Sequence, residues 1–311
     1  MKRKIFNIIA STIILLITIL VFILSSDISQ SFTKNIIFII KVLLPSLFPF
    51  MIFINFILYS NCIDYLSLIF KPFERLFKLS KYGITCVVAS ILGGFPYCAI
   101  IVKNFLKENK ISKEEAERLL ISMFFPSVSF LFSSLYSIDN KYIYNILSLY
   151  ISSFILLYIT SFFKKYNVVS LSNNKTKINI NNDYTSIYFN VMNDCIKSMF
   201  SITFSVLFFN IIISLINRFI LNEYISYFIN GLLEFSSTSI NILLIENKTV
   251  LHYIILNIIL SFSSFSIIFQ SLFYTKDIGF NIKKLLLSRI TISIISLLIY
   301  FTIYFLNKIF T

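Results

Sequence analysis

The stretch YISYFINGLLEFSSTSINILLI, Tyr224–Ile245, decides the fold, because it is long and apolar enough to enter a membrane and yet is polar through its middle. The stretch ITCVVASILGGFPYCAIIV, Ile84–Val102, carries Gly93-Gly94-Phe95-Pro96 at its centre. Glycine and proline both disfavour a continuous helix interior. Interrupted segments at matching places in the two halves of a chain are typical of transporters built from repeats. The sequence therefore predicts two broken or re-entrant membrane segments.

The rest of the chain is equally apolar. Of 311 residues, 57% are hydrophobic and 13% are charged, whereas a soluble domain has about 25% charged residues. The mean hydropathy is +0.85, and apolar runs of roughly 20 residues, the length that crosses a bilayer, recur along the chain. We predict an all-α polytopic membrane protein whose partner is the lipid bilayer. The further segments expected to span it are Ile5–Leu24, Asn35–Tyr59, Leu119–Leu135, Tyr142–Phe163, Val191–Leu215, Leu251–Phe273 and Leu285–Leu306.

The positions of Lys and Arg set the expected orientation. The chain has 27 Lys and Arg against 14 Asp and Glu, a net charge of +13, and the basic residues lie in short loops between apolar runs. Short loops rich in Lys and Arg stay cytoplasmic. If every segment crosses, the basic residues divide evenly between the two faces; if the two interrupted segments re-enter, they gather on one face. We therefore predict about seven transmembrane helices, two re-entrant segments, a cytoplasmic N-terminus and no nucleic-acid partner.

This topology divides the chain into four parts. Residues 1–34 form an N-terminal signal-anchor span with its loop, and residues 35–163 form a first half. Residues 164–190, rich in Asn, Lys, Ser and Thr, form a polar cytoplasmic linker. Residues 191–311 form a second half whose first span runs the opposite way through the membrane. The prediction is an inverted repeat of the kind that transporters use.

Glu234 is the outstanding polar residue. A carboxylate at the centre of a membrane segment costs about 2.5–3.5 kcal/mol on insertion scales, so it usually pairs, titrates or lines a watery cavity. Glu234 either has such a role, as a proton or cation coupling site, or lies near an interface because its segment is shallow. The hydroxyls of Ser237 and Thr238 either satisfy the backbone of a broken helix or contact a polar substrate.

The glycine-proline break and one late amide complete the candidate site. Gly93, Gly94 and Pro96 either expose a helix N-terminus that favours an anion or form a simple kink. Gln270 is a buried amide that needs hydrogen-bond partners, and it either stabilises the packing of the helices or contacts the substrate. The candidate substrate-binding residues are Gly93, Gly94, Pro96, Glu234, Ser237, Thr238 and Gln270.

Two local patterns concern the segment Leu119–Leu135, which follows the glycine-proline break. Ser112 and Glu115 form an S-x-x-E capping box, which predicts a helix start leading into Leu119–Leu135. Arg118, at the membrane boundary, either snorkels to the surface or faces an anionic substrate. Pro45 and Pro49 predict a bend in the second span.

The sequence lacks the motifs of the common enzyme classes. It contains no phosphate-binding G-x-x-x-x-G-K-[ST] loop, no recognisable nucleophile–base pair and no cluster of metal ligands. The four cysteines, Cys62, Cys86, Cys98 and Cys195, form no C-x-x-C pair, and the single histidine, His252, begins an apolar segment as an interfacial residue would. We expect no enzymatic activity, no cofactor and no metal.

Five short motifs resemble, in order and spacing, a known family. They are LLPSLFPF (Leu43–Phe50), GGFP (Gly93–Pro96), ISKEEAERLL (Ile111–Leu120), GLLE (Gly231–Glu234) and FSSFSIIFQ (Phe262–Gln270). The chain resembles the YlbJ family of sporulation integral membrane proteins, the stage V dipicolinate transporters, within the nucleoside-recognition or gate domain group. The resemblance extends from about Leu43 to Arg289 and makes the two halves gate-like.

The resemblance implies a function. It implies that the protein moves dipicolinate, a small organic anion, across the mother-cell-derived outer forespore membrane during sporulation. Apart from the resemblance, a second copy of the chain in a homo-oligomer is a further expected partner. The chain departs from the family pattern at Phe124-Phe125-Pro126-Ser127, where the family has Asn-Asn-Ser-Gly-Pro, and at Phe262-Ser263-Ser264, where it has Phe-Gly-Gly. The alternatives are a transporter of a nucleoside or another small metabolite, and a sporulation membrane scaffold that transports nothing.

Overall fold

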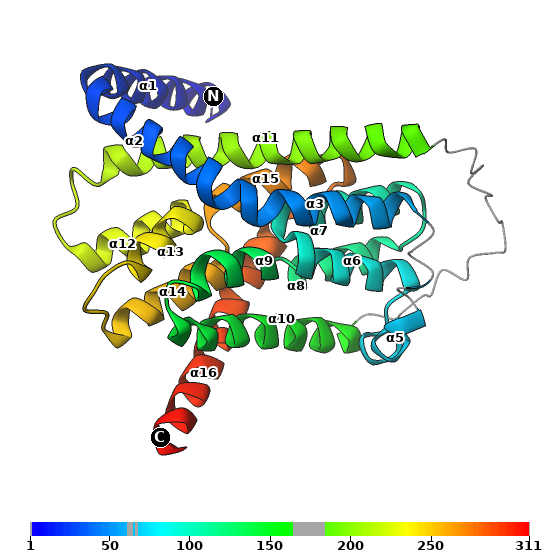
Figure 1. The fold of residues 1–311 in the computed structure, drawn as a ribbon. Helices are drawn as coiled ribbons and strands as arrows, with labels where there is room; N and C mark the ends of the chain where they lie inside the picture. The colour runs from blue at the N-terminus through cyan, green and yellow to red at the C-terminus, as the bar shows by residue number, and fades with distance from the viewer. Residues whose placement is uncertain (1, 61–64, 66–67, 164–183, 311) are drawn as a thin grey trace.

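The computed structural model describes residues 2–60, 65, 68–163 and 184–310, and every regular element within them is helical (Figure 1). The α-helices are α1 (Lys2–Ile23), α2 (Ser25–Phe38), α3 (Leu44–Tyr59), α5 (Lys71–Phe77), α6 (Lys81–Gly93), α7 (Phe95–Lys107), α8 (Lys113–Ser122), α9 (Val128–Phe130), α10 (Ile143–Phe163), α11 (Tyr184–Ile216), α12 (Glu223–Leu233), α13 (Phe235–Leu243), α14 (Val250–Phe262), α15 (Phe265–Thr275) and α16 (Ile282–Phe310). Two π-helices, η1 (Ile39–Leu43) and η2 (Leu131–Tyr136), and two 3₁₀ turns, η3 (Asn140–Tyr142) and η4 (Lys276–Ile278), complete them.

Within the described residues, five helical stretches are long and apolar enough to cross a membrane. They are Ser25–Tyr59, Asn140–Phe162, Tyr184–Ile216, Val250–Ile278 and Ile282–Ile309. Each coincides with one of the seven predicted spans. The chain is therefore an all-helical protein with the long apolar helices of an integral membrane protein. A sixth candidate is the apolar helix pair α5 and α6, which is bent by 101° at its junction.

Four segments in the described part of the chain are interrupted, and the sequence predicts two of them. α6 gives way to α7 at Gly94, and α12 gives way to α13 at Glu234, as expected. The predicted span Leu119–Leu135 is instead split into α8 and α9. Its break contains Pro126, which cannot donate a backbone hydrogen bond and disfavours a helical residue before it, and Ser127 then caps α9 by accepting from the Phe130 N–H.

The fourth interruption separates α14 from α15. The stretch Val250–Ile278 is long and apolar enough for the span predicted over Leu251–Phe273, but its helix is interrupted at Ser263 and Ser264, which the sequence did not predict. Their φ angles of 74° and 48° lie in the left-handed region that L-residues other than glycine rarely adopt. No helix continues through such a pair, so α15 starts anew at Phe265.

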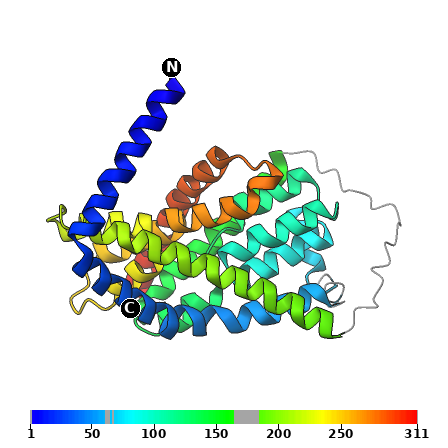
Figure 2. The same ribbon diagram turned by 90° about the horizontal axis from the view of Figure 1, so that it is seen from above.

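The interrupted pairs occupy opposite ends of the bundle. In Figures 1 and 2, α6 and α7 lie toward one end and α12 and α13 toward the other, while the 33-residue α11 runs the length of the bundle. α3 and α10 lie along the same direction (Figure 1). α1 extends away from the bundle, most clearly in Figure 2. The breaks of both pairs therefore face the middle of the molecule.

The helix limits refine the predicted boundaries. Residues 164–183 of the predicted linker lie outside the described residues, and the rest of it, from Tyr184, already belongs to α11. α2 runs through the predicted boundary at residue 34. Pro45 and Pro49 lie at the start of and within α3, directly after the helix widens into η1. A π-helical turn of this kind marks a local departure from regular helix hydrogen bonding.

Polar contacts fix the junction between α5 and α6. Ser112 caps α8 as predicted, by accepting from the Glu115 N–H at 3.1 Å. The Glu115 carboxylate, however, reaches across to accept from the Ser80 N–H at 2.7 Å. Arg118 is buried and donates to the carbonyls of Phe77 and Lys78 at the end of α5. It therefore neither snorkels nor faces a substrate in this structure.

Candidate functional site

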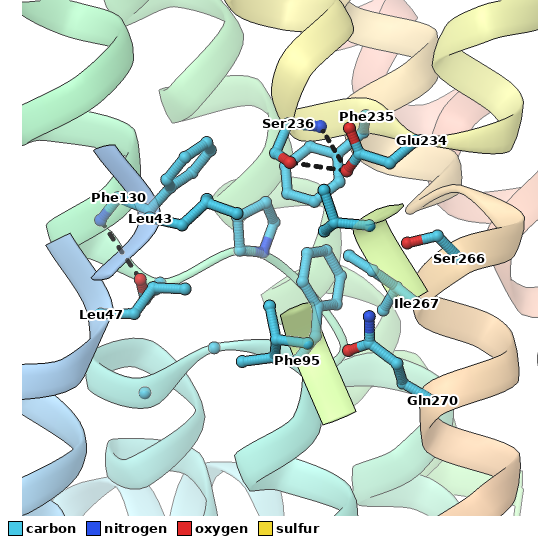
Figure 3. A pocket seen from close by; sticks show the side chains of 16 residues that line it. Leu43, Leu47, Phe95, Phe130, Glu234, Phe235, Ser236, Ser266, Ile267 and Gln270 are labelled. Atoms are coloured by element: carbon cyan, nitrogen blue, oxygen red, sulfur yellow. Dashed lines mark hydrogen bonds between the residues drawn. The ribbon is translucent and has the colours of Figure 1, made fainter. Parts of the chain in front are cut away.

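A cavity of about 40 Å³ lies where the four interruptions meet (Figure 3). Its walls come from each interrupted pair and from three continuous elements, η1, α3 and α11. The residues that line it are Leu43, Leu47, Gly93, Gly94, Phe95, Pro126, Ser127, Phe130, Ile202, Val206, Glu234, Phe235, Ser236, Ser266, Ile267 and Gln270. Segments far apart in sequence thus share one site.

Gly94 brings two of the interruptions into direct contact. Its φ is 75°, and a Cβ atom placed on it would lie 2.7 Å from the backbone nitrogen of Ser127. A side chain is therefore excluded by both conformation and space, because a backbone atom cannot yield as a flexible side chain can. The link between α6 and α7 is held against the link between α8 and α9 only because residue 94 is glycine.

The Glu234 carboxylate caps α13 from within the cavity wall. The side chain is fully buried, and its Oε1 accepts from the Ser236 N–H at 3.0 Å and from the Ser236 hydroxyl at 2.6 Å. Its Oε2 accepts from the Ser237 N–H at 2.8 Å and from the Ser237 hydroxyl at 2.6 Å. A negative charge is favoured at a helix N-terminus, where unpaired N–H groups and the helix dipole converge. The chain thus supplies a side-chain cap of its own to this helix.

Two other helix N-termini at the cavity have no such side chain. α7 begins after Gly94, which has no side chain to offer, and α15 begins after Ser264, whose side chain makes no capping hydrogen bond. On α15, the hydroxyl of Ser266 is buried without a hydrogen-bond partner among the described residues. Gln270, 5% exposed and one turn further along, has no hydrogen bond within the same part of the chain. Figure 3 shows Gln270 directed from α15 toward the cavity.

Aromatic rings form much of the remaining wall. Phe235 contacts Phe95 and Phe130 edge to face, with centroids 5.5 Å and 5.6 Å apart. Such pairs are rigid, apolar surfaces with a defined geometry. The cavity therefore combines a few polar groups with walls suited to a planar ring, which is the usual composition of a small-molecule site.

The structure brings together most of the residues predicted for the site. Gly93, Gly94, Glu234 and Gln270 line the cavity. Ser237 and Thr238 do not: the Ser237 hydroxyl donates to Glu234, with Asn210 Oδ1 a further 3.2 Å contact, and Thr238 is buried behind the cavity wall. The backbone of Pro96 lies in the first turn of α7, and its side chain lies outside the described part of the structure.

Comparison of the chain with protein families, with curated proteins and with solved structures finds no match.

Sequence reasoning misses Arg289 of α16. This side chain is 0% exposed and donates to the carbonyls of Ile121 and Phe124, where α8 ends. The guanidinium carbon lies 5.2 Å from the centre of the Phe124 ring, which packs against Phe95 of the cavity. Within the described residues no carboxylate pairs with it. The available signal was a basic residue inside the predicted span Leu285–Leu306, since charges at such depth are rarely incidental.

The described residues contain no group of three or more His, Cys, Asp or Glu that could hold a metal ion. Cys86, Cys98 and Cys195 are free and buried. His252 lies at the start of α14, where its Nδ1 accepts from the Thr249 N–H at 3.0 Å. The polar chemistry that remains at the cavity is hydrogen bonding by uncapped backbone N–H groups, one amide and one hydroxyl, beside a carboxylate already satisfied.

Proposed function

We propose that the protein is a membrane transporter that moves a small organic anion, dipicolinate, through the central cavity. The observation that carries the proposal is the meeting of four helix interruptions at one buried site. Irregular backbone at membrane depth is tolerated only where protein buries it or where it lines a cavity. In transporters, broken helices of this kind form the substrate site between two repeats.

The placement of the broken pairs supports an inverted-repeat arrangement. α6 with α7 and α12 with α13 approach the middle from opposite ends (Figure 1). Read with the bias of Lys and Arg, this placement supports two re-entrant segments that enter the membrane from opposite faces. Alternating access would then come from movement of one half against the other around a fixed site.

The chemistry of the cavity favours an aromatic anion. The uncapped N-terminus of α7 attracts negative charge, and the unpartnered Gln270 amide and Ser266 hydroxyl offer hydrogen bonds from the facing wall. Phe95 and Phe235 suit the faces and edges of a planar ring. Dipicolinate, a pyridine with two carboxylates, combines these features, and its site of action would be the outer forespore membrane.

The backbone at Ser263 and Ser264 is consistent with the family resemblance behind this assignment. The YlbJ family has two glycines where this chain has these serines, and both serines have positive φ angles. Glycine adopts such conformations without steric cost. Glu234 would serve as the proton or cation coupling site, because a fixed carboxylate beside a dianion requires a compensating positive charge.

A nucleoside is the second candidate. The groups at the cavity that lack partners, the Gln270 amide and the Ser266 hydroxyl, are neutral. Neutral donors and acceptors between aromatic walls also suit a nucleobase and its sugar. Competition between ligands for one site separates the two candidates.

Equilibrium binding of radiolabelled dipicolinate to the purified protein tests the proposal. Gln270→Leu should weaken binding about tenfold, because it removes a hydrogen bond to a charged ligand. The matched control is Gln30→Leu, which changes an exposed glutamine of α2 and should bind as the wild type does. Equal affinities of Gln270→Leu and Gln30→Leu for dipicolinate would contradict the assigned site. Displacement of bound dipicolinate by a nucleoside, and by no other small anion, would favour the second candidate.

A further inference from the structure

A second and larger cavity, of about 530 Å³, lies between α3, α7 and α11. Its lining is much more polar than that of the central cavity and includes Asn55, Tyr59, Asn104, Asn190 and Asp194. Asn104 and Asn190 are exposed, whereas Asn55 is 4% exposed. The cavity thus leads from the surface into the interior, and we call it the vestibule.

The vestibule and the central cavity share the same three helices. On α3, Leu47 faces the central cavity and Asn55 faces the vestibule. On α11, Ile202 lines the central cavity and Asp194, about two helical turns away, lines the vestibule. On α7, Phe95 belongs to the central cavity and Ile101 to the vestibule. The two cavities therefore lie one after the other along these helices.

A hydrogen-bonded layer lies between the two cavities along these helices. The Asn55 amide donates to the Tyr97 hydroxyl at 2.5 Å and lies 3.3 Å from the Cys195 sulfur. The Tyr97 hydroxyl lies 3.5 Å from the Met51 carbonyl. None of these residues is more than 4% exposed. The layer contains one residue from each of α3, α7 and α11, together with a backbone carbonyl of α3.

The layer is built so that it can open. The contacts between its residues are a few neutral hydrogen bonds, each worth only about 1 kcal/mol net. Separating these residues therefore requires less free energy than separating a fully packed apolar core. Tyr97 is also held by the α6 side of the break: a Cβ on Gly93 would lie 2.9 Å from its ring and 2.9 Å from Ile54. Movement of the α6–α7 link therefore reaches Tyr97 directly.

The acidic groups of the vestibule are already engaged. Asp194 accepts from the Tyr59 hydroxyl at 2.5 Å, and Glu108 pairs with Lys110 at 2.5 Å. The amides of Asn104 and Asn190 remain at the exposed end. An anion that enters here meets these amide donors and the Lys110 ammonium alongside the two carboxylates.

A third cavity, intermediate in volume between the other two, lies on the opposite side of the central cavity. It is lined by Lys41, Ser46, Ser133, Ser134 and Ile240. These residues belong to η1, α3, η2 and α13, and along α3 they precede Leu47, whereas the vestibule residues follow it. The central cavity therefore lies between polar recesses on both sides.

We propose that the vestibule is the route by which a small organic anion enters or leaves the central cavity, and that Asn55, Tyr97 and Cys195 form its gate. The proposal rests on the transport function proposed above. In the structure the gate is closed. Opening requires Tyr97 to separate from Asn55, which exposes Cys195 to the vestibule.

Reaction of Cys195 with a membrane-impermeant maleimide measures the gate directly. The background is a variant in which Cys62, Cys86 and Cys98 are replaced by Ala, reconstituted in proteoliposomes. Tyr97→Phe and Asn55→Ala should each raise the labelling rate of Cys195 about tenfold, the effect of losing one or two hydrogen bonds. Tyr142→Phe is the matched control, because Tyr142 is fully buried and its hydroxyl has no partner in the described part of the chain; it should leave the rate unchanged.

The gate and the transport function fail in different ways. Unchanged labelling of Cys195 in both gate variants would overturn the gate, whatever the flux of dipicolinate. Faster labelling in Tyr97→Phe and Asn55→Ala, with no change in Tyr142→Phe, supports the gate whether or not the wild type carries dipicolinate. Absence of dipicolinate flux in the wild type would overturn only the assigned cargo. Equal acceleration in all three variants would show general loosening and would overturn the gate.

Discussion

Ser264 has φ 48° and ψ 155°, a backbone conformation found almost only in glycine. Its hydroxyl is buried and has no hydrogen-bond partner among the described residues, so the side chain contributes strain without a compensating contact. Ser264→Gly should therefore raise the free energy of unfolding by about 1 kcal/mol, the strain relieved less the added entropy of the unfolded chain. Thermal denaturation of the purified protein in detergent measures this change.

The control for Ser264→Gly is Ser153→Gly in the middle of α10. Ser153 is also buried with an unpartnered hydroxyl, but it lies in regular helix. There glycine should lower the free energy of unfolding by about 0.5–1 kcal/mol. Destabilisation of the same size in both variants would show that Ser264 is not strained.

At the residue scale, the candidate site could be predicted from isolated polar residues within apolar stretches. Glu234 and Gln270 stand out in sequence because a carboxylate and an amide need partners in a membrane, and both line the cavity. Ser266 could not be found in this way, since serine is common in these helices and often donates to its own backbone. Only the fold shows that its hydroxyl has no partner.

At the scale of elements, Asp139 joins the turn before α10 to the start of α14. Its carboxylate accepts from the Tyr253 hydroxyl and the Lys141 N–H at 2.5 Å and 3.0 Å, and Lys248 Nζ lies 3.4 Å away. Partial burial raises the pKa of Asp139, but these hydrogen bonds and the Lys248 charge outweigh burial and lower the pKa below its ordinary value. A carboxyl whose pKa is lowered by folding stabilises the fold above its unfolded-state pKa of about 3.9, and this contribution is lost as the pH falls toward the folded-state pKa.

Asp139→Asn should therefore lower the thermal midpoint at neutral pH, and the difference from the wild type should shrink as the pH falls below about 4. Glu246→Gln, at an exposed carboxylate in the loop before α14, serves as the control and should change the midpoint little. A deficit for Asp139→Asn that persists unchanged at low pH would contradict the electrostatic account.

The interruptions show how much of the element structure the sequence could predict. The residues Gly93-Gly94-Phe95-Pro96 and the polar run around Glu234 predict the interruptions at which they lie, because glycine, proline and capping residues disfavour a continuous helix. Pro126 followed by Ser127 is a similar signal, outweighed in the prediction by the apolar residues around it. Ser263 and Ser264 carry no intrinsic breaking signal, so tertiary packing and not local propensity determines that fourth break.

At the scale of the whole molecule, the proposed inverted repeat places two loops on opposite faces of the membrane. Single cysteines introduced at Asn174, in the linker outside the described residues, and at Asn247, exposed between α13 and α14, should react with an impermeant thiol reagent from the cytoplasmic and the external face respectively. The four native cysteines are replaced beforehand. Reaction of both positions from the same face is incompatible with the inverted arrangement.

The overall architecture was the most predictable level. Five of the predicted spans coincide with long apolar helices, because length and hydropathy alone specify a membrane helix. The convergence of the breaks at one cavity was beyond sequence reasoning, since it depends on contacts such as that between Gly94 and Ser127, which are distant in the chain.

Dipicolinate flux into proteoliposomes tests the central claim, transport through the cavity beside Glu234, most directly. The wild type should take up dipicolinate faster than protein-free liposomes when a proton or cation gradient is imposed. Glu234→Gln should insert and still bind dipicolinate but lose the coupled uptake, because an amide neither takes up a proton nor carries a negative charge that pairs with a cation. Wild-type uptake no faster than in protein-free liposomes would contradict the transporter, and wild-type uptake by Glu234→Gln would contradict the role of the carboxylate.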